Sequence, residues 1–169
     1  MKKHLFLTGE KRVGKSTLLK KILEKHQGAI GGFFTVKSNE VLADCVSVHL
    51  LRAGTADVPT EENLLFICRA VDDKVMERFD RMGCAALTER QDVTLLVMDE
   101  LGPHEVNARA FQRTVRQALD GTTPILGILQ KADSVFLKEI AEHPEVKLVE
   151  VTKENRDALA VSVEKTGWL

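Results

Sequence analysis

The residues best suited to chemistry lie in one glycine-containing loop near the start of the chain. Residues 9–16 read Gly-Glu-Lys-Arg-Val-Gly-Lys-Ser and match the spacing Gly-x4-Gly-Lys-Ser/Thr in full. Glycines in such a loop let backbone N–H groups turn toward phosphate oxygens, and the helix that follows adds its partial positive charge. Lys15 is expected to reach the β- and γ-phosphates, and the Ser16 hydroxyl to bind Mg²⁺. The sequence therefore predicts a site for a nucleoside triphosphate. The predicted phosphate-binding residues are Gly9, Glu10, Lys11, Arg12, Val13, Gly14, Lys15, Ser16 and Thr17.

A pair of carboxylates forms the second candidate group. Asp99 and Glu100 follow the apolar run Val93–Met98, which is typical of a strand buried in a parallel sheet. An aspartate at the end of a core strand beside a phosphate loop completes the magnesium shell, so Ser16 and Asp99 are the predicted metal residues. A glutamate directly after it is placed to orient or deprotonate the attacking water. Glu100 is therefore the predicted general base.

Phosphoryl transfer also gains from a cation near the γ-phosphate. Lys131 follows a predicted core strand, and Arg156 stands in the segment Asn155–Asp157 near the end of the chain. Either side chain is a candidate for this role. The predicted catalytic set is thus Glu100, Lys15, Lys131 and Arg156.

The elements that must position these groups alternate along the chain. Short apolar runs predict strands, and apolar residues at helical spacing predict helices between them. Strands are expected at 4–8, 30–36, 45–51, 93–98, 124–129 and 146–151. Helices are expected after the loop up to Gly28, from Thr60 through Cys68, over 71–86, 107–120 and 134–141, and after Thr152. This order predicts a three-layer α/β fold of the P-loop NTPase type, with a mostly parallel sheet extended by an antiparallel hairpin. The ligand is expected at the carboxyl ends of the strands.

Composition narrows the class of protein further. The chain has 169 residues, 44% of them hydrophobic, and a net charge of −1. We predict a single domain over 1–169, with neither a nucleic-acid partner nor a membrane partner, in the cytoplasm. The three cysteines, Cys45, Cys68 and Cys84, show no metal-binding spacing and are expected to be small buried hydrophobic residues.

The chain resembles the THEP1-type nucleoside triphosphatases, a P-loop family that hydrolyses several nucleoside triphosphates with little base preference. Beside the phosphate loop, the resemblance rests on Gly32–Thr35, on Met98–Glu105, which is similar to the family's Ile-Asp-Glu-Ile-Gly-x-x-Glu, and on Glu150–Asp157. The resemblance implies Mg²⁺-dependent hydrolysis of a nucleoside triphosphate to the diphosphate and phosphate.

The chain also departs from the family pattern. Arg12 replaces a glycine within the loop, Val36–Glu40 replaces a glycine- and arginine-rich hairpin, and Gln130-Lys131 replaces a His-Arg type pair. These departures predict a divergent member of the family with a specialised substrate or an unidentified protein partner.

Three alternatives share the same loop. The run 99–102 fits the Asp-x-x-Gly pattern of a GTP-dependent switch, and Gln130-Lys131-Ala132-Asp133 resembles Asn-Lys-x-Asp, whose aspartate reads guanine. A small-molecule or nucleotide kinase is the second alternative, although no arginine-rich lid or acceptor pocket is evident in the sequence. A nucleotide-binding adapter without catalytic activity is the third.

Overall fold

The computed structural model describes residues 2–90, 92–105 and 107–165. A seven-stranded sheet runs through this part of the chain in the order β4-β3-β2-β5-β6-β1-β7. Its strands are β1 (His4–Thr8), β2 (Ile30–Ser38), β3 (Ser47–Arg52), β4 (Leu64–Ile67), β5 (Leu95–Leu101), β6 (Ile125–Leu129) and β7 (Val146–Glu150). From β2 to β7 the neighbouring strands are parallel, whereas β3 pairs antiparallel with both β2 and β4. The predicted mostly parallel sheet with an antiparallel extension is confirmed.

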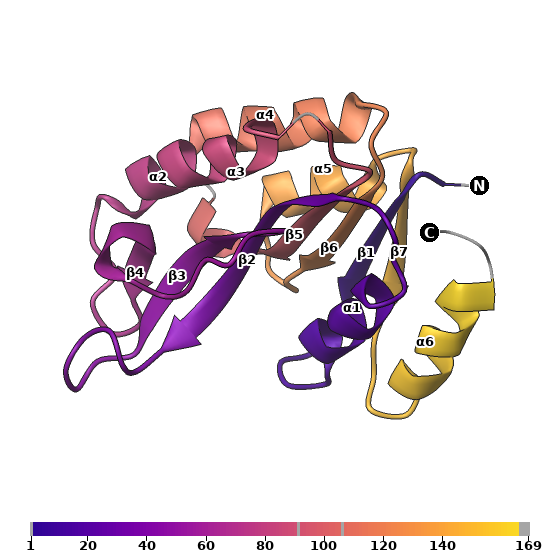
Figure 1. The fold of residues 1–169 in the computed structure, drawn as a ribbon, viewed down its shortest axis with the longest axis horizontal. Coiled ribbons are helices and arrows are strands. Elements are labelled where there is room, and N and C mark those ends of the chain that lie inside the picture. The colour runs from indigo at the N-terminus through magenta and orange to yellow at the C-terminus, as the bar shows by residue number, and fades with distance from the viewer. Residues whose placement is uncertain (1, 91, 106, 166–169) are drawn as a thin grey trace.

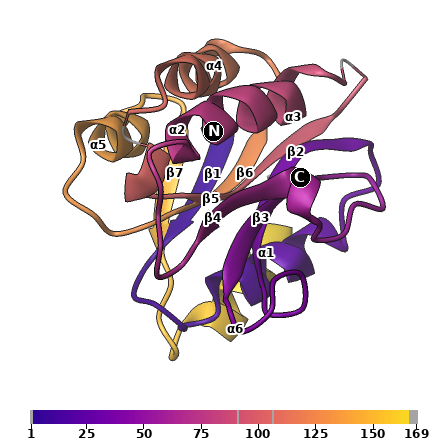
Figure 2. The same cartoon turned by 90° about the vertical axis from the view of Figure 1, so that its left-hand side faces the viewer.

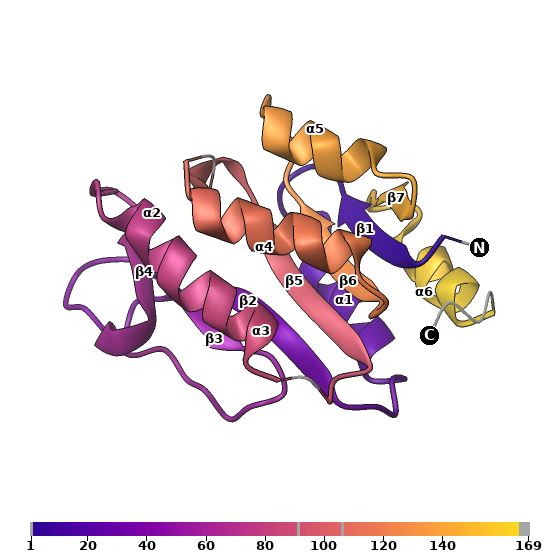
Figure 3. The ribbon, with the colours of Figure 1, turned by 90° about the horizontal axis from the view of Figure 1, so that it is seen from above.

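Helices cover both faces of the sheet (Figure 1). One face carries α2 (Val75–Arg78), the π-helical segment η2 (Phe79–Gly83), α3 (Cys84–Thr88), α4 (Arg109–Asp120) and α5 (Val135–Glu142). Seen from above, the α2–α3 segment, α4 and α5 lie side by side over the strands (Figure 3). The opposite face carries α1 (Lys15–Leu23) and α6 (Arg156–Lys165), which pack against each other (Figure 2). Two 3-10 turns, η1 (Glu61–Asn63) and η3 (Pro103–Glu105), complete the described elements.

The central strand β5 shows why the sheet is buried on both faces. Successive strand side chains point to opposite sides, so a strand covered twice must be apolar throughout. Leu96 and Met98 join the core that includes the residues of α4, whereas Leu95 and Val97 join the core that includes those of α1. The continuous apolar run that predicted a buried strand is thereby explained.

Two predictions about local structure were wrong. Residues 60–68 do not form a helix: after the short turn η1 the chain enters β4, because Leu65 is fully buried against the core as a strand residue. The Asn63 side chain accepts from the Thr60 N–H over 2.9 Å and so caps the start of this turn, which spans only three residues before β4. The helix expected over 71–86 starts only at Val75 and contains the π-helical segment η2.

The cysteines also differ from expectation. Cys45 and Cys68 are exposed and Cys84 is partly buried, all as thiols. Cys45 lies two residues before β3 and Cys68 directly follows β4, so both stand outside the strands themselves. The residue type alone does not reveal this, because cysteine is buried in most proteins.

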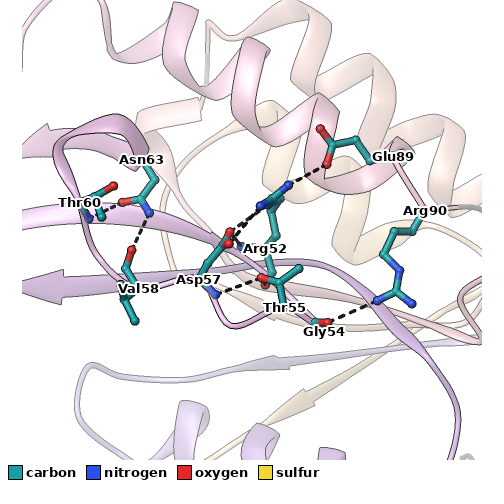
Figure 4. Close-up of polar contacts among 9 residues, drawn as sticks. All are labelled: Arg52, Gly54, Thr55, Asp57, Val58, Thr60, Asn63, Glu89 and Arg90. Atoms are coloured by element: carbon teal, nitrogen blue, oxygen red, sulfur yellow. Dashed lines mark hydrogen bonds and ion pairs between the residues drawn. The ribbon is translucent and has the colours of Figure 1, made fainter.

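A polar cluster orders the long connection between β3 and β4 (Figure 4). Arg52 Nε donates to Asp57 Oδ2 over 2.9 Å, and its Nη1 lies 3.4 Å from the carboxylate of Glu89 at the end of α3. The neighbouring Arg52 guanidinium lowers the pKa of the Asp57 carboxyl to about 2. Because β3 is antiparallel to β2, this cluster lies at the edge of the sheet away from the carboxyl ends of the parallel strands.

None of the helices within the described ranges is long and apolar enough to cross a bilayer.

The Phe111 side chain on α4 is expected to contribute strongly to stability. Its ring is fully buried and stands 5.7 Å from the ring of Phe33 and 5.6 Å from that of Phe79. Phe111→Ala should lower the free energy of unfolding by about 3–5 kcal/mol through lost burial and the cavity left behind. Val135→Ala, at a side chain exposed by 73%, is the control and should change it by about 0.5 kcal/mol or less. Urea unfolding of the two variants checks this, and equal losses would contradict it.

Candidate functional site

The carboxyl ends of β1, β6, β5 and β2 meet at one edge of the sheet, as their parallel arrangement requires. The loops that leave this edge line a cavity of about 1110 Å³. Its lining residues are Gly9, Glu10, Lys11, Arg12, Gly14, Lys15, Ser16, Thr17, Thr35, Val36, Lys37, Val48, Phe66, Cys68, Phe79, Glu100, Gly102, His104, Glu105, Gln130, Lys131 and Arg156. The fold thus brings the predicted phosphate loop, Glu100 and both candidate cations to one cavity.

The phosphate loop, residues 9–16, depends on glycine at two positions. Gly9 has φ +140°, and a Cβ there would stand 2.3 Å from the carbonyl oxygen of Val151 after β7. Gly14 has φ +102° directly before α1 begins at Lys15. These are backbone conformations that a side chain disfavours, so the loop can close tightly only with glycine at both places.

Arg12 and Val13 of the phosphate loop each have a feature that their prediction as phosphate-binding residues does not explain. Arg12 has φ +62°, the left-handed region, where the resembled family usually has glycine. The Arg12 backbone therefore adopts a conformation that is easy for glycine and unfavourable for a residue with a side chain. Val13 was predicted among the phosphate-binding residues, but its side chain is 8% exposed and packs in the core that contains Leu18. Only its backbone can serve a phosphate.

The ammonium of Lys15 is held in place by the loop itself. Its Nζ donates to the carbonyl of Gly9 over 2.9 Å and to that of Glu10 over 2.7 Å. The side chain is 9% exposed, so its charge is presented to the cavity from a largely desolvated position. An ammonium held this way attracts phosphate oxygens more strongly than one fully surrounded by water.

The acidic strand end places two carboxylates in different surroundings. Asp99 is 5% exposed, and burial, reinforced by the adjacent Glu100, raises its pKa to about 7. Glu100 is partly exposed and lines the cavity, and its backbone N–H donates to Thr35 Oγ1 over 3.2 Å. Gln130, at the end of β6, donates from its amide to Glu100 Oε1. One carboxylate is thereby sheltered beneath the site, and the other is oriented at its surface.

Thr35 and Gln130 are functional candidates that the sequence reasoning did not assign. Thr35 lies in the segment Gly32–Thr35 that resembles the family, and Gln130 replaces a residue of the family's His-Arg type pair. Neither pattern predicts a role in the site. Both positions stand at the end of a predicted strand, as Asp99 does, and this was the signal that could have revealed them. The strand order explains why both side chains reach Glu100: β5 lies between β2, which carries Thr35, and β6, which Gln130 follows.

The donor groups fit a magnesium ion. A hydroxyl and a carboxylate are oxygen donors of the kind that Mg²⁺ binds, together with phosphate oxygens and water. Asp99 is buried with a raised pKa, so a nearby divalent cation would favour its charged form. Within the described ranges no cluster of three or more His, Cys, Asp or Glu side chains could hold a metal by itself.

Glu105 and His104 occupy the turn η3 after β5. Glu105 is 2% exposed and its Oε2 accepts from the Gly102 N–H over 3.0 Å, while burial raises its pKa to about 8. A buried carboxyl bonded to the backbone of its own turn braces the turn that follows Glu100. The His104 ring stands 4.5 Å from the ring of Phe66 on β4.

The two candidate cations differ in how fully their charge is compensated. Lys131 Nζ lies 2.6 Å from a carboxylate oxygen of Glu150 and 3.2 Å from one of Glu10, so two carboxylates share it. The Arg156 side chain lies over the phosphate loop, with its Cδ and one Nη 3.2 and 3.3 Å from the position of a Cβ on Gly14. Its ion pair with Asp157 is long, at 3.8 Å. Arg156 is therefore the better source of positive charge for a phosphate.

These features define a P-loop protein built to bind a triphosphate beside an acidic strand end. The family model described as NTPase matches residues 4–163. The chain therefore belongs to this NTPase family, which confirms the resemblance to the THEP1-type nucleoside triphosphatases.

Curated relatives agree over nearly the whole chain. The nucleoside-triphosphatase THEP1 of Thermotoga maritima is 26% identical over 157 residues, covering 92% of this chain and 90% of the relative. The cancer-related nucleoside-triphosphatase homolog of Bos taurus is 29% identical over 180 residues, covering 94% and 93%. Among solved structures, THEP1 from Aquifex aeolicus superposes with a TM-score of 0.73 over 95% of this chain and 96% of that one, at 22% identity. That last likeness shows the shared fold.

Stability without nucleotide is expected to fall as pH rises toward 8. Folded Glu105 keeps its proton to about pH 8, whereas the unfolded carboxyl loses it near 4.5. Between these values the folded state binds the extra proton, so the group lowers the free energy of unfolding by about 1.4 kcal/mol per pH unit. Glu105→Gln, which cannot titrate, should remove this share of the slope and leave that of Asp99. Urea unfolding from pH 5 to 8 checks it; an unchanged slope in the variant would contradict the assignment.

Removing Arg156 is expected to harm nucleotide turnover more than removing Lys131. Lys131 already has two carboxylate partners, whereas the Arg156 guanidinium stands over the phosphate loop with one distant partner. Arg156→Ala should lower kcat/KM at least tenfold further than Lys131→Ala, because a cation near the γ-phosphate stabilises the transition state. Steady-state phosphate release by the two variants measures this. A larger loss in Lys131→Ala would reverse the assignment.

Proposed function

We propose that the protein is a Mg²⁺-dependent nucleoside triphosphate hydrolase that forms the diphosphate and phosphate with broad base preference. The observation that carries the proposal is the convergence of Lys15, Ser16 and Glu100 on one cavity. Membership of the NTPase family supports it, as do the printed names of the relatives.

The residues divide the work as follows. Backbone N–H groups of the phosphate loop and the N-terminus of α1 hold the phosphates, while Lys15 draws the β- and γ-phosphate oxygens. Ser16 and Asp99 would hold Mg²⁺, which when bound neutralises charge on the β- and γ-oxygens. Arg156, whose side chain lies beside Gly14, adds positive charge at the loop.

Glu100 acts on the attacking water. Thr35 and Gln130 bind its backbone and one carboxylate oxygen, which fixes the group in one orientation. The carboxylate accepts a proton from the water as the oxygen attacks the γ-phosphorus. General-base action of this kind contributes about 10²–10⁴ in rate.

The alternative of a GTP-dependent switch depends on an aspartate that reads the guanine base. Asp133, the residue expected to read guanine, does not line the cavity and instead pairs with Lys138 over 2.7 Å. The three carboxylates that line the cavity are engaged elsewhere, Glu10 with Lys131, Glu100 with Gln130 and Glu105 with the Gly102 N–H. A site that holds the nucleotide through its phosphates would accept several bases, which supports the proposed broad preference.

Glu100→Gln is expected to keep nucleotide affinity and to lose turnover by about 10²–10⁴. The amide preserves size and can still contact Gln130, but it cannot take the proton from water. Lys15→Ala is the matched comparison and should weaken nucleotide binding itself. Single-turnover assays with ATP, GTP, CTP and UTP, combined with calorimetric binding, measure both effects. Full residual hydrolysis in Glu100→Gln would rule out the general-base role.

A further inference from the structure

The cavity continues well beyond the groups that handle the phosphates. One part of it lies against β3, β4, the start of η2 and the turn η3, and is lined by Val48, Phe66, Cys68, Phe79 and His104. We call these five residues the apolar arm. The whole cavity, about 1110 Å³, is at the upper end of the roughly 300–1,000 Å³ usual for a ligand pocket. The arm is the part of it that the phosphate-binding residues do not line.

The strand order places Glu100 between the phosphate loop and the arm. Across the sheet the phosphate loop follows β1, Gln130 follows β6, Glu100 lies on β5, Thr35 lies on β2, and the arm begins at β3. A triphosphate held as proposed, with Lys15 on its β- and γ-phosphates and Glu100 at the attacking group, would point with its terminal phosphate from β1 toward β5. A molecule in the arm would therefore approach the γ-phosphorus from the side opposite the leaving diphosphate.

The arm offers a surface for a flat ring. In the strand register Lys37, Val48 and Phe66 form one row across β2, β3 and β4. The rings of Phe66 and His104 stand 4.5 Å apart at 42° and form one wall, and α2 packs against both β4 and η3. Phe79 and Val48 are almost completely buried beneath. Aromatic walls over an apolar floor are suited to a planar heterocycle.

Charge narrows the class of ligand. Six basic side chains and three carboxylates line the whole cavity, and Lys37 is exposed at the end of the row that enters the arm. The excess of positive charge favours a neutral or anionic molecule over a cation. A nucleoside or its 5′-monophosphate combines a flat base, hydroxyl or phosphate oxygens, and the right sign of charge.

Hydrolysis does not require such a surface, because the attacking water beside Glu100 needs no contact with the apolar arm. We propose that the arm binds a nucleoside or nucleoside monophosphate as a phosphoryl acceptor, so that the protein transfers the γ-phosphoryl group to it as well as to water. This inference rests on the proposed triphosphate orientation. It revives the kinase alternative, for which the sequence showed no acceptor pocket.

The transfer step balances without a further reactant. An acceptor oxygen, hydroxyl or phosphate, attacks the γ-phosphorus and forms the new P–O bond. The bond between that phosphorus and the β–γ bridging oxygen breaks, and the nucleoside diphosphate leaves with the electron pair. Where the acceptor is a hydroxyl, Glu100 takes its proton. Release of phosphate in the absence of acceptor is then the same reaction with water in place of the organic group.

The test follows the fate of labelled γ-phosphate. The whole protein is mixed with Mg²⁺, γ-labelled ATP and one acceptor at a time: adenosine, guanosine, cytidine, uridine or their 5′-monophosphates. At least one acceptor is expected to yield a labelled phosphorylated product and to lower the share released as phosphate. Phe66→Ala should lower the transfer rate at least tenfold and shift the partition toward phosphate. His104→Ala, at an exposed residue whose loss does not threaten folding, should shift it in the same direction.

Val58→Ala is the matched control. Val58 lies on the same extension and is 63% exposed, but it lines a separate cavity beside Arg52 and Met82. This variant should keep the partition of the unaltered protein. Binding of the acceptors to the complex with Mg²⁺ and the non-hydrolysable ATP analogue AMP-PNP is measured by calorimetry as an independent readout.

Two results would overturn the proposal. The first is label recovered only as phosphate with all eight acceptors, together with no saturable binding to the AMP-PNP complex. The second is a Phe66→Ala variant that binds ATP itself more weakly, since the arm would then hold the base of the same nucleotide. Phosphate release without acceptor reports separately on hydrolysis, so a failure of the proposed function is distinguishable from a failure of this inference.

Discussion

A carboxylate pair at the end of a fully buried strand is the constraint on which the site depends. β5 is apolar from Leu95 to Met98 because the sheet is covered on both faces, and the polar pair Asp99 and Glu100 stands between this run and the buried Leu101. Burial keeps Asp99 costly to ionise, so its charge is favoured only beside positive charge. The loop beyond β1 supplies such charge at the same edge through Lys15. The packing that buries β5 and the chemistry at its end are therefore linked.

Polar groups at neighbouring strand ends complete this arrangement. Thr35 from β2 and Gln130 from β6 reach Glu100 from its two sides, and Glu105 braces the turn that follows. Thr35 follows the last residue of β2 that pairs with β5, Gln130 follows β6, and Glu105 lies in the turn after β5. A parallel sheet gathers such positions at one edge. The orientation of Glu100 is thus a property of three adjacent strands and not of its own loop.

The antiparallel extension makes the part of the cavity beside β3 and β4 apolar. There β3 and β4 bring Val48 and Phe66 to the same edge as the phosphate loop, under the start of η2. The long connection between β3 and β4 is held by the ion pair of Arg52 with Asp57, and Arg52 also pairs with Glu89 directly after α3. A polar, cationic region and an apolar region therefore share one cavity, although they arise from opposite ends of the strand order.

Much of the fold and of the site follows from local patterns alone. The glycine spacing of residues 9–16, the apolar run before Asp99 and the alternation of strands with helices determine the phosphate loop, the acidic strand end and the α/β class, because each depends on neighbours in the sequence. Residues 60–68 and Cys45 were misjudged, since their environment is set by the sheet edge and not by their own pattern. The roles of Thr35, Gln130 and the apolar arm were decided only by the tertiary structure. They depend on which strands lie side by side, and that order arises from contacts between residues far apart in the chain.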